Sequence, residues 1–105
     1  MASASSVTKS DENDSIIIRA MGCLMGQAVG DALGTRYEFS DSASAKKQLT
    51  KDYKNKFLAI LGEGPFKLVP GQVTDDTELA LALARSLVRK KSFDIYDIAQ
   101  SYVVW

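Results

Sequence analysis

Residues 74–90 decide the fold class, and they read TDDTELALALARSLVRK. Leucine and alanine fill the stretch from Leu79 to Ala84, so a helix here is apolar almost all round. Such a helix is buried on most sides in a larger all-α protein. The acidic residues and threonines before it are typical of a helix N-terminus. The stretch therefore predicts a buried helix from about Thr74 to Lys90.

Helical patterns continue on both sides of this stretch. Residues 15–33 carry apolar side chains at helical spacing after Ser15, a residue type that caps helices, and residues 41–61 show a weaker helical pattern. Residues 95–105 form an amphipathic segment that follows Asp94. Between them, residues 62–71 hold two prolines and three glycines, which forbid regular structure and predict an ordered loop. No strand pattern competes, so the predicted fold class is all-α.

The first predicted helix contains glycines at four-residue spacing, at positions 22, 26, 30 and 34. Each glycine inside a helix costs about 1 kcal/mol relative to alanine, so the row needs a tertiary reason. Spacing of four places them on one ridge, which allows another backbone to come close. We favour tight helix packing, with Gly34 as the C-cap. The alternative is that this helix lies beneath a ligand.

The N-terminal residues 1–14, MASASSVTKSDEND, are small and polar and predict a disordered tail, which leaves residues 15–105 as one domain. The longest apolar stretch, residues 16–30, is interrupted by Arg19 and followed by Asp31. We expect it to be too short and too charged to span a membrane. Thirteen basic residues balance thirteen acidic ones, so charge gives no attraction to nucleic acid or anionic membrane.

Histidine is absent, which excludes Ser-His and Cys-His catalysis and histidine-ligated zinc within this sequence. The single cysteine, Cys23, cannot form an internal disulfide and indicates a reducing, cytoplasmic setting. Lysines gather in the second helical segment, and a solvated helix face explains them better than a phosphate site. They stand at positions 46, 47, 51, 54 and 56.

Two interpretations of Thr74, Asp75 and Asp76 remain open from the residues alone. Thr74 or Asp75 can cap the helix, and Asp75 with Glu78 resembles a capping box. Capping needs only one or two acidic residues, however, and three stand within four positions. Adjacent carboxylates with a hydroxyl are also the hard oxygen ligands that Mg²⁺ or Mn²⁺ prefers.

Two long motifs then resemble the ADP-ribosylglycohydrolase family, which includes the dinitrogenase reductase-activating glycohydrolase. The first is GCLMGQAVGDALG at residues 22–34 with YEF at 37–39, and the second runs from GPF at 64–66 to PGQVTDDTE at 70–78. Tyr102 to Trp105 also resemble the start of the family's next stretch, so the resemblance covers about residues 18–105. Two motifs in the right order are far more specific than a glycine pattern alone.

The resemblance implies a metal-dependent hydrolase that removes ADP-ribose from modified proteins or small molecules. Thr74, Asp75 and Asp76 match the first ligand triplet of a site for two Mg²⁺ or Mn²⁺ ions. Glu38 matches a glutamate near the metals on a mobile loop, with a role in catalysis or substrate positioning. Asp31 is expected to be structural.

The sequence departs from the family in its length. Members are much longer all-α domains, and a second acidic motif that supplies the remaining metal ligands does not occur here. We therefore expect an N-terminal portion that carries half of the site, is inactive alone, and folds poorly or self-associates through exposed apolar helix faces. The alternatives are a non-catalytic helical module of the same family and a purely structural helical adaptor.

Overall fold

The computed structural model describes residues 9–54 and 59–105, and its side chains from residue 12 onward. In these residues it contains helices, loops and one isolated β-bridge. The elements are α1 (Lys9–Gly34), the 3-10 helix η1 (Thr35–Tyr37), α2 (Ser42–Tyr53), α3 (Asp75–Lys90) and α4 (Ile95–Val104). The predicted all-α class is confirmed.

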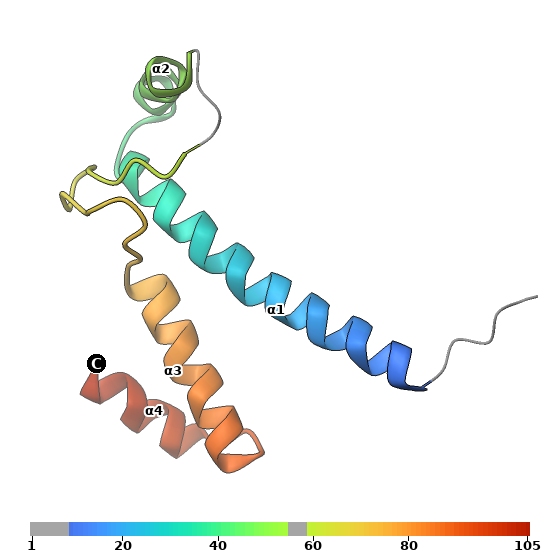
Figure 1. Cartoon of the computed structure of the whole chain (residues 1–105). Helices are drawn as coiled ribbons and strands as arrows, with labels where there is room; N and C mark the ends of the chain where they lie inside the picture. Colours follow the sequence, from blue (N-terminus) through green and yellow to red (C-terminus); the bar gives the residue numbers. More distant parts are fainter. Residues whose placement is uncertain (1–8, 55–58) are drawn as a thin grey trace, which may run out of the picture.

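The helices spread from one junction, where the end of α1, η1 and the start of α3 meet (Figure 1). α1 and α3 diverge from this point, α4 folds back along α3, and α2 lies beyond the end of α1. The radius of gyration is 19.2 Å, whereas a compact domain of this length has about 13 Å. The chain is therefore open, with its closest tertiary contacts near the junction and between α3 and α4.

α1 is longer than the sequence pattern predicts. It begins at Lys9, so residues 9–14 of the predicted disordered tail are helical, while residues 1–8 lie outside the described part. Extending an existing helix fixes one residue for each bond gained, and acidic residues favour its N-terminal end. The C-cap prediction for Gly34 is also wrong. Gly34 has right-handed helical angles (φ −76°, ψ −35°), and the chain continues directly into η1.

α2 is shorter than predicted. Asp41 caps its N-terminus, because one carboxylate oxygen accepts from the backbone N–H groups of Ala43 and Ser44, each at 3.0 Å. The helix ends at Tyr53, and residues 59–61 are not helical although helix was predicted there. The Tyr53 hydroxyl donates to the Ala59 carbonyl at 2.6 Å. The described lysines of α2 and Lys54 are exposed, as a solvated face requires. Lys56 lies outside the described residues.

The predicted ordered loop is confirmed. Glu63 and Leu68 exchange two backbone hydrogen bonds across a tight turn, with N···O distances of 2.6 and 3.1 Å. Gly64 has φ +72°, and a Cβ atom there would lie 2.7 Å from the Arg36 Cα atom. Only glycine fits this conformation and this close approach without strain. The loop therefore packs backbone to backbone against η1.

Helices α3 and α4 form an antiparallel pair joined by polar contacts. Asp94 caps α4 by accepting from Tyr96 N and Asp97 N, both at 3.1 Å. Asp97 in turn accepts from the hydroxyl of fully buried Ser86 at 2.5 Å and pairs with Arg89. These contacts fix α4 against the C-terminal half of α3.

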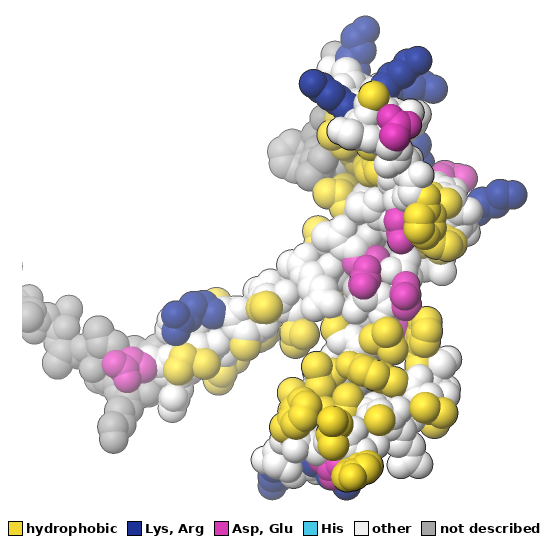
Figure 2. Space-filling model, turned by 180° about the vertical axis from the view of Figure 1, so that it is seen from behind, with side chains coloured by type: hydrophobic (Ala, Val, Ile, Leu, Met, Phe, Trp, Pro, Cys, Tyr) yellow, Lys and Arg dark blue, Asp and Glu magenta, His cyan; other side chains and the backbone are white. Residues whose placement is uncertain are grey.

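The apolar core is small. Among the described residues, Ala32 and Ile98 are the buried apolar side chains. The burial of α3 on most sides, expected for a larger all-α protein, is not provided by the described residues. Its buried residues among them are Thr77 and Ser86, and Val88 is 77% exposed. Figure 2 shows hydrophobic side chains gathered over α3 and α4, and basic side chains around α2. Large apolar faces therefore remain uncovered.

α1 is long and apolar enough to cross a membrane by length and composition. Over Glu12–Tyr37, an 18-residue window has a mean hydropathy of 1.4, so the expectation that this stretch is too short was wrong. The same properties are found in core helices of soluble proteins. In the described residues 6% of this window is buried, and Asp31 in this helix makes polar contacts with α3.

Candidate functional site

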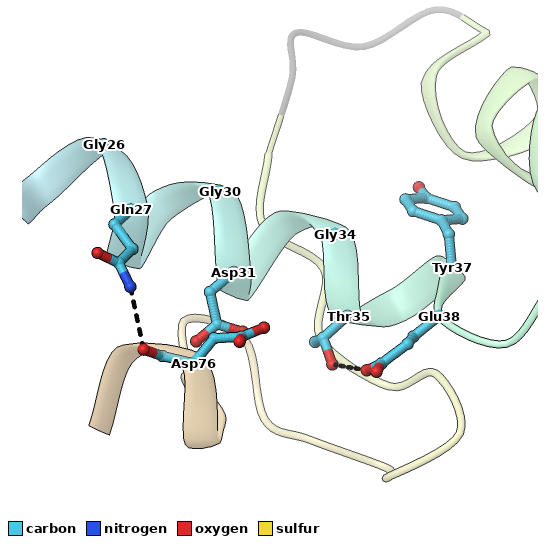
Figure 3. A pocket seen from close by; sticks show the side chains of 9 residues that line it. All are labelled: Gly26, Gln27, Gly30, Asp31, Gly34, Thr35, Tyr37, Glu38 and Asp76. Atoms are coloured by element: carbon cyan, nitrogen blue, oxygen red, sulfur yellow. Dashed lines mark hydrogen bonds between the residues drawn. The ribbon is translucent and has the colours of Figure 1, made fainter. Parts of the chain in front are cut away.

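A pocket of about 510 Å³ opens at the junction of α1, η1 and α3 (Figure 3). Its wall brings together residues from both sequence motifs. Glu38 reaches it from the end of η1, and Asp76 reaches it from the first turn of α3. The full lining is Gly26, Gln27, Gly30, Asp31, Gly34, Thr35, Tyr37, Glu38 and Asp76.

Glu38 is held by the turn that precedes it. Its backbone N–H donates to the Thr35 carbonyl at 3.3 Å, and the Thr35 hydroxyl donates to Glu38 Oε2 at the same distance. Thr35 is itself buried, with 5% of its surface exposed. The candidate catalytic carboxylate therefore stands at the edge of the pocket on a short, bonded turn.

A half-buried ion pair fixes η1 on its other side. Arg36 Nε donates to Asp52 Oδ2 at 2.7 Å, and a second guanidinium nitrogen reaches Oδ1 at 3.2 Å. Arg36 also donates to the Gly62 carbonyl at 2.9 Å. Its side chain therefore links η1 to both α2 and the loop. Tyr37 and Gln48 complete the set by donating to Asp52 at 3.0 and 2.9 Å.

This network determines the protonation of its members. The Arg36 guanidinium, helped by Tyr37 and Gln48, holds the pKa of Asp52 below its ordinary value of 3.8 against the opposing effect of burial. Burial, with smaller effects of Tyr53 and Asp52, raises the pKa of the Tyr37 hydroxyl. At neutral pH Asp52 is therefore an anion and Tyr37 a neutral donor.

The first turn of α3 is not capped by its own side chains. Thr74 occupies the N-cap position, but its hydroxyl donates to Asp31 Oδ1 at 2.7 Å and caps no backbone group. Asp31 Oδ2 instead accepts from Thr74 N at 2.8 Å, from Thr77 N at 3.3 Å and from the Thr77 hydroxyl at 2.6 Å. The predicted cap by Thr74 or Asp75 is therefore wrong, because Asp31 of α1 fills that role. Asp31 is confirmed as structural, although it lies inside α1.

The electrostatics of Asp31 agree with this role. Burial raises the pKa of its carboxyl, but the hydrogen bonds from Thr77 and Thr74 together outweigh burial and hold the pKa below the ordinary value of 3.8. Asp31 is therefore ionised at neutral pH and is an acceptor for both threonines. One turn earlier on α1, Gln27 Nε2 donates to the Asp76 carbonyl at 3.0 Å.

The three predicted metal ligands do not share one pocket. Asp76 lines the pocket with Glu38, whereas Thr74 and Asp75 line a neighbouring pocket of about 630 Å³ together with Phe66 and Trp105. Within the part of the chain that the structure describes, no three acidic, histidine or cysteine side chains converge closely enough to hold an ion. The donors have the oxygen chemistry that Mg²⁺ or Mn²⁺ prefers, but these three alone cannot enclose one.

The glycine ridge of α1 faces the pocket. Among the described residues, nothing lies within 4 Å of a Cβ atom placed at Gly22, Gly26, Gly30 or Gly34, so the close helix packing that we favoured is absent within this part of the chain. Three of the four glycines instead line the pocket, Gly26, Gly30 and Gly34. This position agrees with the alternative, a helix surface beneath a ligand.

Comparison with known proteins identifies the family. Residues 12–105 match the model of ADP-ribosylglycohydrolases. The chain belongs to this family. It is 42% identical over 87 residues to an ADP-ribosyl-(dinitrogen reductase) glycohydrolase of Rhodospirillum rubrum, covering 83% of this chain and 28% of that protein.

Other glycohydrolase relatives show the same partial coverage. An ADP-ribosylarginine hydrolase of Pseudomonas putida (strain GB-1) is 40% identical over 83% of this chain and 21% of its own length. An ADP-ribosylhydrolase of Homo sapiens is 33% identical over 80% and 23%. The chain thus spans between 21% and 28% of the relatives that it matches.

Sequence reasoning missed the residues that hold the glycohydrolase motifs in place. Arg36 and Asp52 stand 16 residues apart, and neither carries a motif signal by itself. Asp31 lies inside the first motif, so its importance was visible, but its partners on α3 were not. These contacts link elements that are distant in sequence, and helical periodicity carries no information about them.

Proposed function

We propose that this chain supplies part of the active site of a divalent-metal-dependent ADP-ribosyl glycohydrolase, which removes ADP-ribose from a modified protein side chain or small molecule. One observation carries the proposal. Glu38 and Asp76 come from separate motifs of the family and line a single pocket. A pocket lined by three carboxylates, those of Asp31, Glu38 and Asp76, beside a glycine-rich wall suits a sugar whose glycosidic bond is to be broken.

Glu38 is the proposed catalytic residue. Its side chain is exposed at the pocket edge, and its Oε2 atom is oriented by the Thr35 hydroxyl. A carboxylate at such a position can transfer a proton to or from the reacting groups at the glycosidic bond. The polar wall that Gln27 and Asp31 contribute can orient the substrate by hydrogen bonding.

Thr74, Asp75 and Asp76 are the proposed holders of Mg²⁺ or Mn²⁺. When bound, such ions supply Lewis-acid polarisation of sugar hydroxyls and of the attacking water. Each takes about six oxygen ligands, so three side chains fit only as one part of a two-ion site. The remaining donors would have to come from another part of the protein or from a second copy of this chain.

A chimeric enzyme tests the proposal. The 87 residues that match the Rhodospirillum rubrum relative replace the corresponding segment of that protein, and release of free ADP-ribose from ADP-ribosylated dinitrogen reductase is followed with Mn²⁺. We expect the chimera to be active. Glu38→Gln and Asp76→Asn should each lower turnover by about 100-fold or more, as loss of a group in proton transfer or metal binding does.

The matched control is Asp41→Asn, which removes an exposed carboxylate that caps α2 outside the pocket. It should leave turnover within about twofold, because its effect is limited to the stability of α2. Full turnover in both Glu38→Gln and Asp76→Asn, in a chimera that needs Mn²⁺, would contradict the assignment of these residues.

A non-catalytic helical module of the same family is the second candidate. The small apolar core and the separation of Asp76 from Thr74 and Asp75 favour it for this chain alone. We expect the isolated chain to release no ADP-ribose at any Mg²⁺ or Mn²⁺ concentration, and to self-associate in sedimentation through its exposed apolar helix faces. A compact active monomer would exclude the non-catalytic module.

We also propose a reducing, cytoplasmic setting, because Cys23 is an exposed free thiol.

A further inference from the structure

The turn that carries Glu38 is anchored from outside the pocket. Asp52 of α2 accepts hydrogen bonds from Arg36 and Tyr37, two of the three residues of η1. None of the described residues of α2 lines the pocket. Glu38, which follows η1 directly, lies at the pocket edge. A side chain that is not part of the pocket therefore holds the backbone from which Glu38 reaches it.

Tyr37 and Glu38 are adjacent in the sequence, and their side chains point in opposite directions (Figure 3). The Tyr37 hydroxyl donates to Asp52 Oδ2 at 3.0 Å. On the other side of the turn, Glu38 Oε2 accepts from the Thr35 hydroxyl at 3.3 Å. Because both side chains leave the same short turn, a rotation of the turn would move both. Holding Tyr37 against Asp52 thus also fixes the direction of the Glu38 carboxylate.

The ion pair makes this anchor rigid. Arg36 donates to both carboxylate oxygens of Asp52, at 2.7 and 3.2 Å, and the two side chains are only 18% and 8% exposed. Two parallel bonds between planar groups define their relative orientation, which a single contact does not. Together with the Tyr37 bond, three hydrogen bonds from consecutive residues join η1 to one carboxylate. The turn therefore has little freedom to rotate.

The backbone directly after Glu38 is strained and needs such an anchor. Phe39 has φ +57°, a left-handed conformation that is unfavourable for a bulky residue. Its side chain is 82% exposed and contacts Phe66 edge to face, with ring centroids 6.0 Å apart, so burial of Phe39 offsets little of the strain. Strained backbone persists where surrounding contacts over-determine it. Here the bonds from η1 to Asp52 supply such contacts.

We propose that Asp52 is a positioning residue of the candidate site, which acts through Arg36 and Tyr37 to fix the orientation of the Glu38 carboxylate. This inference rests on the proposed catalytic role of Glu38. A group that transfers a proton must stand in a defined geometry, and misplacing it by about 1 Å can lower the rate about 100-fold. Asp52 thus controls turnover without contacting the substrate.

The orientation of Glu38 is measured in the full chain by nuclear magnetic resonance, from its vicinal Hα–Hβ couplings. One fixed rotamer gives couplings at the extremes of their range, whereas averaging over rotamers gives intermediate values. Asp52→Asn should shift the Glu38 couplings to intermediate values. Asp41→Asn is the matched control, because it removes another aspartate whose bonds stay at the start of α2. It should leave the Glu38 couplings unchanged.

A second variant separates orientation from the loss of a charge. Tyr37→Phe keeps every charge and removes only the hydroxyl that donates to Asp52. The Glu38 couplings should shift in the same direction as in Asp52→Asn, by a smaller amount. Tyr96→Phe is its control, because it removes a hydroxyl from an 85% exposed side chain of α4. Should Asp52→Asn fail to fold, the two tyrosine variants decide the result.

Turnover is measured in the chimera with the Rhodospirillum rubrum relative, at a temperature where circular dichroism shows each variant fully folded. Asp52→Asn should lower kcat about tenfold and leave KM within about twofold, because a misplaced proton-transfer group affects the reacting step and not substrate binding. Asp41→Asn should leave both constants unchanged. Glu38→Gln shows in the same assay whether Glu38 is catalytic.

The outcomes are distinguishable. Shifted couplings and a lower kcat in Asp52→Asn, with both controls unchanged, support the inference. Glu38 couplings that keep their original values in Asp52→Asn and Tyr37→Phe overturn it, as do intermediate couplings in the unmodified chain. An unchanged kcat in Asp52→Asn beside a low kcat in Glu38→Gln overturns the inference and leaves the proposed function standing. Full turnover in Glu38→Gln removes the catalytic role of Glu38, and the inference with it.

Discussion

At the junction of α1 with α3, polar groups contact one another, whereas along the outer faces of α1, α3 and α4 apolar side chains face solvent. The junction comprises Asp31, η1, the loop at 62–68 and the first turn of α3. Its buried or half-buried side chains hydrogen-bond to partners on other elements. On the outer faces, Ile18 is 67% exposed and Val103 is 86% exposed.

The difference shows that geometry and stability are supplied by different parts of this chain. Hydrogen bonds are directional but each contributes only about 1 kcal/mol net, so the junction defines the site without making it very stable. Apolar burial contributes about 25 cal/mol per Å² and would supply most of the stability once the outer faces were covered. The site is therefore locally specified in a chain whose apolar surface is still available for burial.

The largest effect is expected from Gly64→Ala at the junction. The new methyl group would lie 2.7 Å from Arg36 Cα at a backbone with φ +72°, which should destabilise the loop by roughly 3 kcal/mol. Hydrogen exchange of the Glu63 and Leu68 amides, which bond across this loop, measures the loss directly.

Gly71→Ala is the control for that change. Gly71 also has positive φ (+87°), but among the described residues nothing lies within 4 Å of an added Cβ atom. It should cost only about 1 kcal/mol, from the backbone conformation alone. Equal loss of Glu63 and Leu68 protection in the two variants would show that the loop does not depend on its contact with η1.

A smaller effect is expected from Asp52→Asn. The amide cannot accept all the hydrogen bonds that Arg36, Tyr37 and Gln48 now donate, so the melting temperature should fall by several degrees near neutral pH. The pKa of Asp52 is lowered in the folded chain. Its stabilisation is therefore present above the ordinary value of 3.8 and is lost as the pH falls through the lower folded value.

The difference in melting temperature between Asp52→Asn and the unmodified chain should accordingly narrow toward about pH 2. Near-ultraviolet circular dichroism of the tyrosines follows this, because Tyr37 donates to Asp52. A difference that stays constant from neutral to acid pH would mean that the charge of Asp52 contributes nothing to the junction.

The smallest effect is expected on the outer face of α1. Gly22→Ala meets nothing within 4 Å among the described residues and lies outside the pocket lining, so it should stabilise the helix by up to about 1 kcal/mol. Gly30→Ala should raise helix content equally but places a methyl group in the pocket. Circular dichroism compares the two, and a loss of helix in Gly22→Ala would show that the ridge packs against a partner.

The sequence was informative wherever structure is local. Asp94 and the apolar pattern after it placed α4, and the acidic start of residues 74–90 placed α3 within one residue. α1 was misjudged at its start, which depends on helix propagation, and α2 at its end, which lies at Tyr53. The resemblance to the family identified Glu38 and Asp76 as site residues. That both line one pocket could not be predicted, because it depends on how α3 lies against α1. The Asp31 cap was hidden because periodicity describes one helix at a time.

The remote cap of α3 also affects the order in which the helices form during folding. Asp41 and Asp94 reach amides only two or three residues away, so α2 and α4 can start within microseconds as independent segments. The cap of α3 requires closure of a loop of 43 residues between Asp31 and Thr74. That closure carries an entropic cost and slows the step. The start of α3 should therefore be among the last parts of this chain to form, and the acidic motif should acquire its native arrangement only after α1 is in place.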